Sequence, residues 1–196
     1  MNTLLIVGQV NSLGRPLSRL YCSTGHRLGA WQPPLQPIHR APDISVYLMN
    51  DGPDCPSMVI EVAVEQSLSS QLRDQTAYSV NPEIKMFLGI KVWRKQTEFS
   101  ALVFLYHYPS ASYLSAFSIG TQQIDPNVIL PDGLTLNNAQ SGDSLMANLP
   151  TGENQAMMDL PTIDVFAHVR TPLPQNTAPH VTIDLWMIHE NIIYSL

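Results

Sequence analysis

Residues 58–93 have the sequence MVIEVAVEQSLSSQLRDQTAYSVNPEIKMFLGIKVW, which predicts a strand, a helix and a second strand. The run 58–64 is almost continuously apolar and rich in valine, as in a strand that is covered on both faces. In 66–79, two leucines lie four residues apart, which fits one face of a short helix. Pro82 ends that helix, because proline cannot continue the backbone ladder. The apolar run 84–93 then predicts the next strand.

The segments on either side add strands and one more helix. ISVYL, residues 44–48, is apolar and β-branched and predicts a strand. ALVFLYHY and YLSAFSI, residues 101–108 and 113–119, predict a β-hairpin with a proline and a serine in its turn. The last residues, 181–196, predict a strand followed by a helix, since apolar side chains recur there at helical spacing.

Two segments lack such periodicity. Residues 24–42 include WQPPLQPIH and predict an irregular connector, because proline is excluded from helix interiors and central strands. Residues 137–160 are small and polar and predict a long loop. The length of 196 residues favours one domain. We expect a core over about 40–120 and an elaboration over 121–196, with the loop at 137–160.

The composition excludes several classes of protein. Hydrophobic residues make up 44% and charged residues 13% of the chain, so it is not intrinsically disordered. Two cysteines are too few for a disulfide-dense scaffold or a multi-cysteine zinc cluster. The start, MNTLLIVGQVNS, lacks the basic region of a secretory signal, and no run of about 18 apolar residues predicts a membrane span. We therefore expect an intracellular protein, cytoplasmic or nuclear, with no membrane partner.

Charge is distributed unevenly between the two halves of the chain. Residues 1–95 hold nine of the ten cations and seven acids, whereas residues 96–196 hold one cation and nine acids. A nucleic-acid-binding protein usually has a basic surface, and here only the first half could provide one. The acidic half has a simpler explanation, which is that it supports solubility.

Two carboxylates occupy unusual positions. Asp43 follows Pro42 directly before the strand at 44–48, and Glu61 lies in the middle of the most apolar strand. An ionised carboxylate in such a strand is costly unless it is paired, hydrogen-bonded or bound to a metal. If the two strands are neighbours, both side chains can converge on one point. Two oxygen ligands of this kind suit Mg²⁺ or Mn²⁺, which keep several waters and bind substrate phosphate.

A structural explanation of the same residues stands beside this one. Glu61 could form a buried ion pair with Arg73, Lys85 or Lys91, and Asp43 could only shape the turn after Pro42. On that interpretation neither carboxylate has a chemical role.

The order of these residues resembles a known superfamily. PDISVYL, PSMVIEVAVEQSLSSQLRDQTAYS and IKMFLGI together resemble the PD-(D/E)XK nucleases, and more closely the restriction-endonuclease-like proteins of bacteria and fungi. The resemblance covers about residues 40–95. It implies an α/β fold with a restriction-endonuclease-like central mixed β-sheet, flanking helices and a β-rich C-terminal elaboration. It also implies hydrolysis of phosphodiester bonds in DNA or RNA with Mg²⁺ or Mn²⁺.

Residue by residue, the resemblance makes Asp43 and Glu61 the metal ligands. The superfamily has a lysine two residues after the glutamate, and this chain has Ala63 there. Lys85, at the start of the next strand, is the first candidate to replace it, and Lys91 is the second. The helix also carries glutamines and Tyr78, residue types of the Gln–Tyr motif of exonuclease relatives, at a different spacing.

Three hypotheses follow for function. The first is a metal-dependent nuclease in which Asp43, Glu61 and Lys85 are catalytic and nucleic acid is the partner. The second is a catalytically inactive domain of the same fold that serves as a binding or interaction module, favoured by Ala63 and the acidic net charge of −6. The third is a β-rich structural assembly protein. The low surface charge is also compatible with a homodimer interface.

Overall fold

The computed structural model describes residues 20–23, 42–48, 56–137, 157–167 and 177–194. The elements follow one another as β1 (Leu20–Ser23), β2 (Ile44–Leu48), β3 (Met58–Ala63), α1 (Leu68–Tyr78), β4 (Met86–Lys95), β5 (Glu98–His107), β6 (Ser112–Gly120), β7 (Met157–Pro161), α2 (Thr162–Val165), β8 (His180–Asp184) and α3 (Leu185–Tyr194). None of these helices is long and apolar enough to cross a membrane.

Six strands form one mixed sheet in the order β1–β2–β3–β4–β5–β6, and β7 pairs with β8 in a second, two-stranded sheet. Neighbours in the large sheet are antiparallel except β3 and β4, which run parallel. A parallel pair needs a crossover connection, and α1 is that connection. The expected mixed α/β architecture is therefore confirmed.

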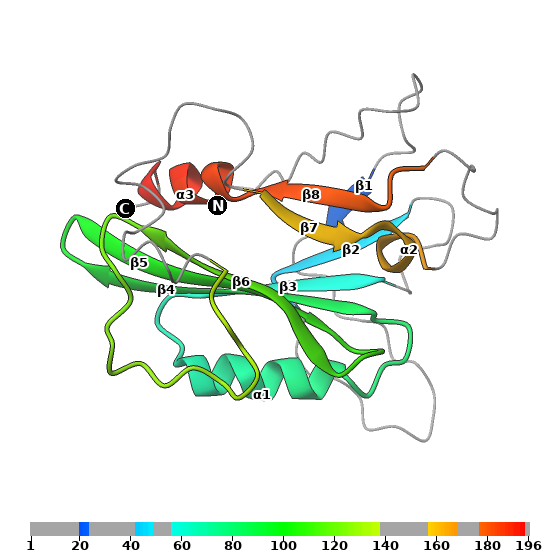
Figure 1. The fold of residues 1–196 in the computed structure, drawn as a ribbon, viewed down its shortest axis with the longest axis horizontal. Helices are drawn as coiled ribbons and strands as arrows, with labels where there is room; N and C mark the ends of the chain where they lie inside the picture. The colour runs from blue at the N-terminus through cyan, green and yellow to red at the C-terminus, as the bar shows by residue number, and fades with distance from the viewer. Residues whose placement is uncertain (1–19, 24–41, 49–55, 138–156, 168–176, 195–196) are drawn as a thin grey trace.

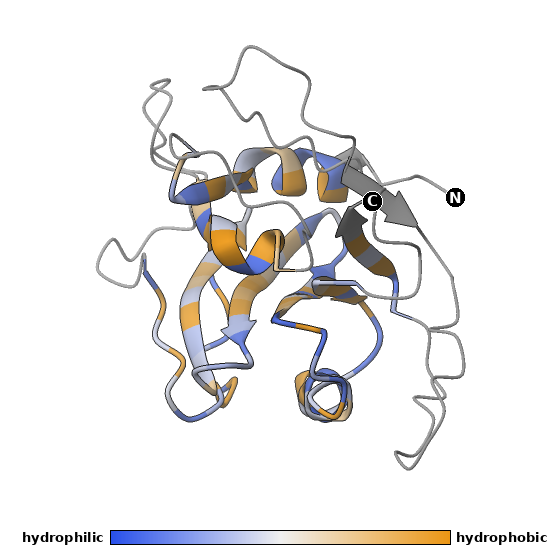
Figure 2. Cartoon of the chain, turned by 90° about the vertical axis from the view of Figure 1, so that its right-hand side faces the viewer, coloured by the Kyte–Doolittle hydropathy of each residue, from blue (hydrophilic) through white to orange (hydrophobic). Residues whose placement is uncertain are grey.

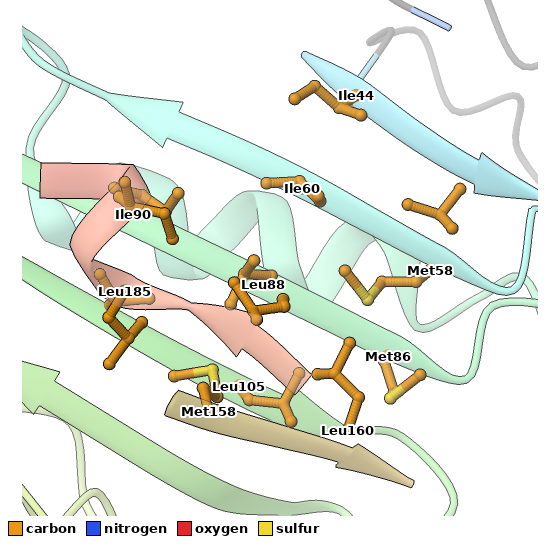
Figure 3. Packing of buried hydrophobic residues seen from close by; sticks show 14 of the residues in the cluster. Ile44, Met58, Ile60, Met86, Leu88, Ile90, Leu105, Met158, Leu160 and Leu185 are labelled. Atoms are coloured by element: carbon orange, nitrogen blue, oxygen red, sulfur yellow. The ribbon is translucent and has the colours of Figure 1, made fainter. Parts of the chain in front are cut away.

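The large sheet is covered on both faces (Figure 1). Helix α1 lies on one face, and β7, β8 and α3, which we call the C-terminal layer, lie on the other. Because side chains alternate along a strand, Ile60, Leu88 and Met86 face the C-terminal layer, and Met86 lies beside Leu160 (Figure 3). On the other face, Phe87 packs against Tyr78 of α1. Burial on both faces accounts for the nearly continuous apolar runs of β3 and β4.

Helix α1 presents polar side chains to the sheet. Ser67 caps its first turn, since the Ser67 hydroxyl accepts a hydrogen bond from the Ser70 amide at 3.2 Å. The buried residues of α1 are Gln71, Gln75 and Tyr78. Figure 2 shows the apolar and polar bands of the strands that lie between α1 and the C-terminal layer. Polar groups buried in this way need partners on the strands beneath them.

The prediction of a loop over residues 137–160 is wrong at the end of that range, where Met157–Pro161 form β7. Met158 and Leu160 are buried, and the residues between and before them are exposed, as in a strand with one covered face. The partner of β7 is β8, about twenty residues later in the chain. This pairing between distant segments is what stabilises the strand, and the local sequence pattern does not contain it.

Other differences from the sequence prediction are small. β1 was not predicted, although it pairs with β2. The strand expected at 84–93 begins and ends two residues later as β4, and the strand expected at 101–108 begins three residues earlier as β5. The helix expected at 66–79 is α1, and the strand-then-helix prediction for the C-terminus is confirmed by β8 and α3. The connector expected at 24–42 lies outside the described residues, apart from Pro42.

His189 is buried where α3 meets the sheet. Its ring lies 5.1 Å from the ring of Phe99 and 5.4 Å from that of Trp186, measured between centroids. Neither ring nitrogen has a hydrogen-bond partner in the part of the chain that the structure describes. Burial lowers the pKa of His189, and the adjacent Glu190 opposes part of this shift. The neutral ring is therefore the form that fits this site.

This burial makes stability depend on pH. As the pH falls through 6.5, the unfolded chain binds a proton at His189 more readily than the folded chain, so the free energy of unfolding falls as pH decreases. We expect His189→Phe to flatten this dependence between pH 7 and 5 in chemical denaturation. His180→Gln, which removes an exposed histidine, serves as the control. Parallel curves for wild type and His189→Phe would contradict this account.

Candidate functional site

Asp43 and Glu61 lie opposite each other at the start of the β2–β3 pair. Ile44 pairs with Ile60 in antiparallel register, and where this pairing ends Asp43 directly precedes Ile44 and Glu61 directly follows Ile60, so the two residues lie next to each other. The Cβ atoms of such opposed residues are about 5 Å apart. Asp43 is exposed, and its Oδ2 accepts a hydrogen bond from the Val62 amide at 2.7 Å. The sheet thus brings together the two carboxylates that the sequence singled out.

Helix α1 holds Glu61 at two points. The Glu61 side chain is buried, and its Oε1 accepts a hydrogen bond from the Tyr78 hydroxyl at 2.5 Å. The main-chain oxygen of Glu61 accepts another from Gln71 Nε2 at 2.8 Å. The helix therefore fixes both the side chain and the backbone of this buried residue.

A third charged group lies on the same face. Lys91 of β4 is the register partner of Ala63, and residues paired in this way point to the same side of a sheet. Its buried ammonium donates to the main-chain oxygens of Val64 at 2.8 Å, Val92 at 3.1 Å and Ala63 at 3.4 Å. Burial lowers the pKa of Lys91. Lys91 thus places a cation at the end of β3, two residues beyond Glu61.

The structure does not bring Lys85 to this pair of carboxylates. Lys85 precedes β4, and its Nζ donates to the main-chain oxygen of Pro82. Glu61 is level with Gly89, so Lys85 lies four residues, or about 13 Å, away along the strand. Of the two lysines proposed from the sequence, Lys91 is the nearer to Glu61 along β4, since it lies two residues from Gly89, the register partner of Glu61.

The donor set is compatible with one small divalent cation. The described residues contain no cluster of three or more histidine, cysteine or acidic side chains suited to a metal. A pair of carboxylates is nonetheless what Mg²⁺ commonly takes from a protein, with waters and phosphate oxygens completing the octahedron. Asp43 and Glu61 are such a pair, and the exposure of Asp43 leaves one side of it open to solvent.

Sequence reasoning placed Lys85 before Lys91 and did not connect Tyr78 with Glu61. The signal for Lys91 was available in the spacing of the strands. Once β3 and β4 are taken as parallel neighbours joined by α1, their registers can be aligned by their apolar runs, and Ala63 then meets Lys91. The Tyr78 contact depends on the length of the side chain and on how α1 rests on the sheet, which the sequence pattern does not specify.

The bond from Val62 to Asp43 predicts a local loss of stability. Asp43→Ala leaves the Val62 amide without its acceptor, which should lower the free energy of unfolding by about 1–3 kcal/mol. Asp43→Asn keeps an acceptor oxygen and should cost less. Amide hydrogen exchange at Val62 measures the effect directly, and we expect faster exchange in Asp43→Ala. Equal exchange at Val62 in wild type and both variants would show that the bond does not form in solution.

No family model, no curated protein and no solved structure matches this chain. What the chain does is therefore inferred from the positions and contacts of Asp43, Glu61, Lys91 and Tyr78.

Proposed function

We propose that this chain is a metal-dependent nuclease of the PD-(D/E)XK type, which hydrolyses phosphodiester bonds in DNA or RNA. The observation that carries the proposal is the register between Ala63 and Lys91, because it puts an ammonium group on the same face as Glu61. Asp43 and Glu61 are the proposed ligands of Mg²⁺ or Mn²⁺. Lys91 takes the place of the lysine that the motif would have at position 63.

Each residue has a role that its contacts support. A bound Mg²⁺ would supply Lewis-acid stabilisation of the phosphoryl oxygens and a water of lowered pKa. Asp43, directly before β2, and Glu61, on β3, would hold the cation. Lys91 adds a fixed positive charge in a buried setting, where it acts more strongly on developing negative charge than in water.

The fold and the surface charge support the same proposal. The order β2, β3, α1, β4 is the order of elements that the resemblance implies, with the carboxylates on β3 and directly before β2. The exposed cations Arg94 and Lys95 follow Lys91 on β4, where they can contact a phosphate backbone.

A second candidate function also rests on specific observations. Glu61 has an exposed fraction of only 4%, and the ammonium of Lys91 donates to three main-chain oxygens. Both groups could serve mainly to hold β3, α1 and β4 together. A catalytically inactive domain of the same fold, acting as a binding module, would have this arrangement.

Metal binding and cleavage separate the two candidates. We expect Mn²⁺ to bind wild type in calorimetry, and Glu61→Gln and Asp43→Asn each to weaken binding by about tenfold or more, since each removes one of two charged ligands. We also expect cleavage of DNA or RNA in the presence of Mg²⁺ or Mn²⁺, reduced about 100-fold or more in Lys91→Gln. Lys85→Gln is the matched control and should cleave as wild type does.

The outcomes are distinct. Thermal unfolding of each variant shows whether a loss of activity is only a loss of folding. If Lys91→Gln fails to fold, Lys91→Arg tests the same position with its positive charge retained. Mn²⁺ binding without cleavage of any DNA or RNA favours the inactive module. No Mn²⁺ binding by folded wild type overturns the proposal.

A further inference from the structure

The hydrogen bond between Tyr78 and Glu61 joins the end of α1 to the middle of β3. Tyr78 has an exposed fraction of 1% and Glu61 of 4%, so water has little access to the bond. The phenol is the donor and the Glu61 carboxylate accepts at Oε1. A hydrogen bond at one carboxylate oxygen restricts rotation of the group about its last carbon–carbon bond.

The hydroxyl of Tyr78 is itself held in place. Its ring packs at 6.1 Å from the ring of Phe87, measured between centroids, and Phe87 lies 5.9 Å from Phe104. Phe104 also lies across Gly89, the register partner of Glu61, where a Cβ atom would come within 2.2 Å of the Phe104 ring. The aromatic cluster therefore fixes the ring that carries the hydroxyl.

We propose that Tyr78 is a positioning residue for the metal site, which acts by holding the Glu61 carboxylate in the orientation that binds the cation. This inference rests on the proposed function, because it assumes that Glu61 is a metal ligand. Groups that hydrogen-bond to metal ligands commonly set their orientation and thereby the affinity of the site. Gln71 complements Tyr78, since it fixes the main-chain oxygen of Glu61 from the same helix.

A matched pair of tyrosines separates positioning from simple support of the helix. Tyr108 also donates its hydroxyl to α1, to the main-chain oxygen of Gln75 at 2.7 Å. Its bond attaches the helix to the turn between β5 and β6 and does not involve Glu61. Replacing either tyrosine with phenylalanine keeps the ring and removes one hydrogen bond. Tyr78→Phe removes a bond that α1 donates, and Tyr108→Phe removes a bond that α1 accepts. Only Tyr78→Phe changes the hydrogen bonding of the Glu61 carboxylate.

The test compares these two variants in full-length protein. Mn²⁺ affinity is measured by calorimetry, and the visible absorption spectrum of bound Co²⁺ reports the coordination geometry. We expect Tyr78→Phe to weaken Mn²⁺ binding by about tenfold or more and to change the Co²⁺ spectrum. Tyr108→Phe should leave both close to wild type. In a Glu61→Gln background, Tyr78→Phe should have no further effect on Mn²⁺ affinity.

The outcomes distinguish this inference from the proposed function. If wild type binds Mn²⁺ and Tyr78→Phe matches Tyr108→Phe in affinity and spectrum, the positioning role is overturned and the metal site stands. If folded wild type binds no Mn²⁺, the proposed function fails, and the role of Tyr78 at a metal site fails with it. A tenfold loss confined to Tyr78→Phe, with an altered Co²⁺ spectrum, supports the inference.

Discussion

A carboxylate buried in the middle of an apolar strand is the constraint on which the rest of this structure depends. Removing an isolated charge such as that of Glu61 from water costs several kcal/mol, so the strand is tenable only if the fold supplies partners. Helix α1 supplies them, with the Tyr78 hydroxyl on the side chain and the Gln71 amide on the backbone. A hydrogen bond to a charged group contributes about 1.5–3 kcal/mol, which makes α1 a necessary cover for this strand.

The crossover through α1 also explains the arrangement of charges. Helix α1 crosses over the sheet, so β4 lies beside β3 and runs parallel to it. Each residue of β3 then has a register partner on β4. Lys91 then lies beside Ala63, and its ammonium donates to the last main-chain oxygens of β3. On the other side of β3, antiparallel pairing with β2 brings Asp43 opposite Glu61. One strand with one neighbour on each side therefore assembles two carboxylates and a cation from distant parts of the sequence.

Much of the fold could be predicted from local patterns, because both faces of β3 and β4 are covered and their apolar runs are long. The same reasoning failed for β7, since only two of its residues, Met158 and Leu160, are buried and its partner strand is distant. For the site, Glu61 was identifiable because an acid in the middle of an apolar strand is unusual, and Asp43 because it follows Pro42 directly before a strand. The position of Lys91 beside Ala63 depended on strand register, and the contact of Tyr78 with Glu61 depended on how a helix with a polar inner face packs. Both are consequences of tertiary packing.

The central claim is that Asp43 and Glu61 form one metal site beside Lys91. Paramagnetic broadening of backbone amide signals in a Mn²⁺ titration tests it most directly, because the effect falls steeply with distance from the ion. The account predicts that the amides of Val62 and its neighbours on β2 and β3 broaden at the lowest Mn²⁺ concentration, and that Glu61→Gln abolishes this pattern. Broadening that begins instead around Asp125 or Asp132, or that is the same in Glu61→Gln as in wild type, would contradict it.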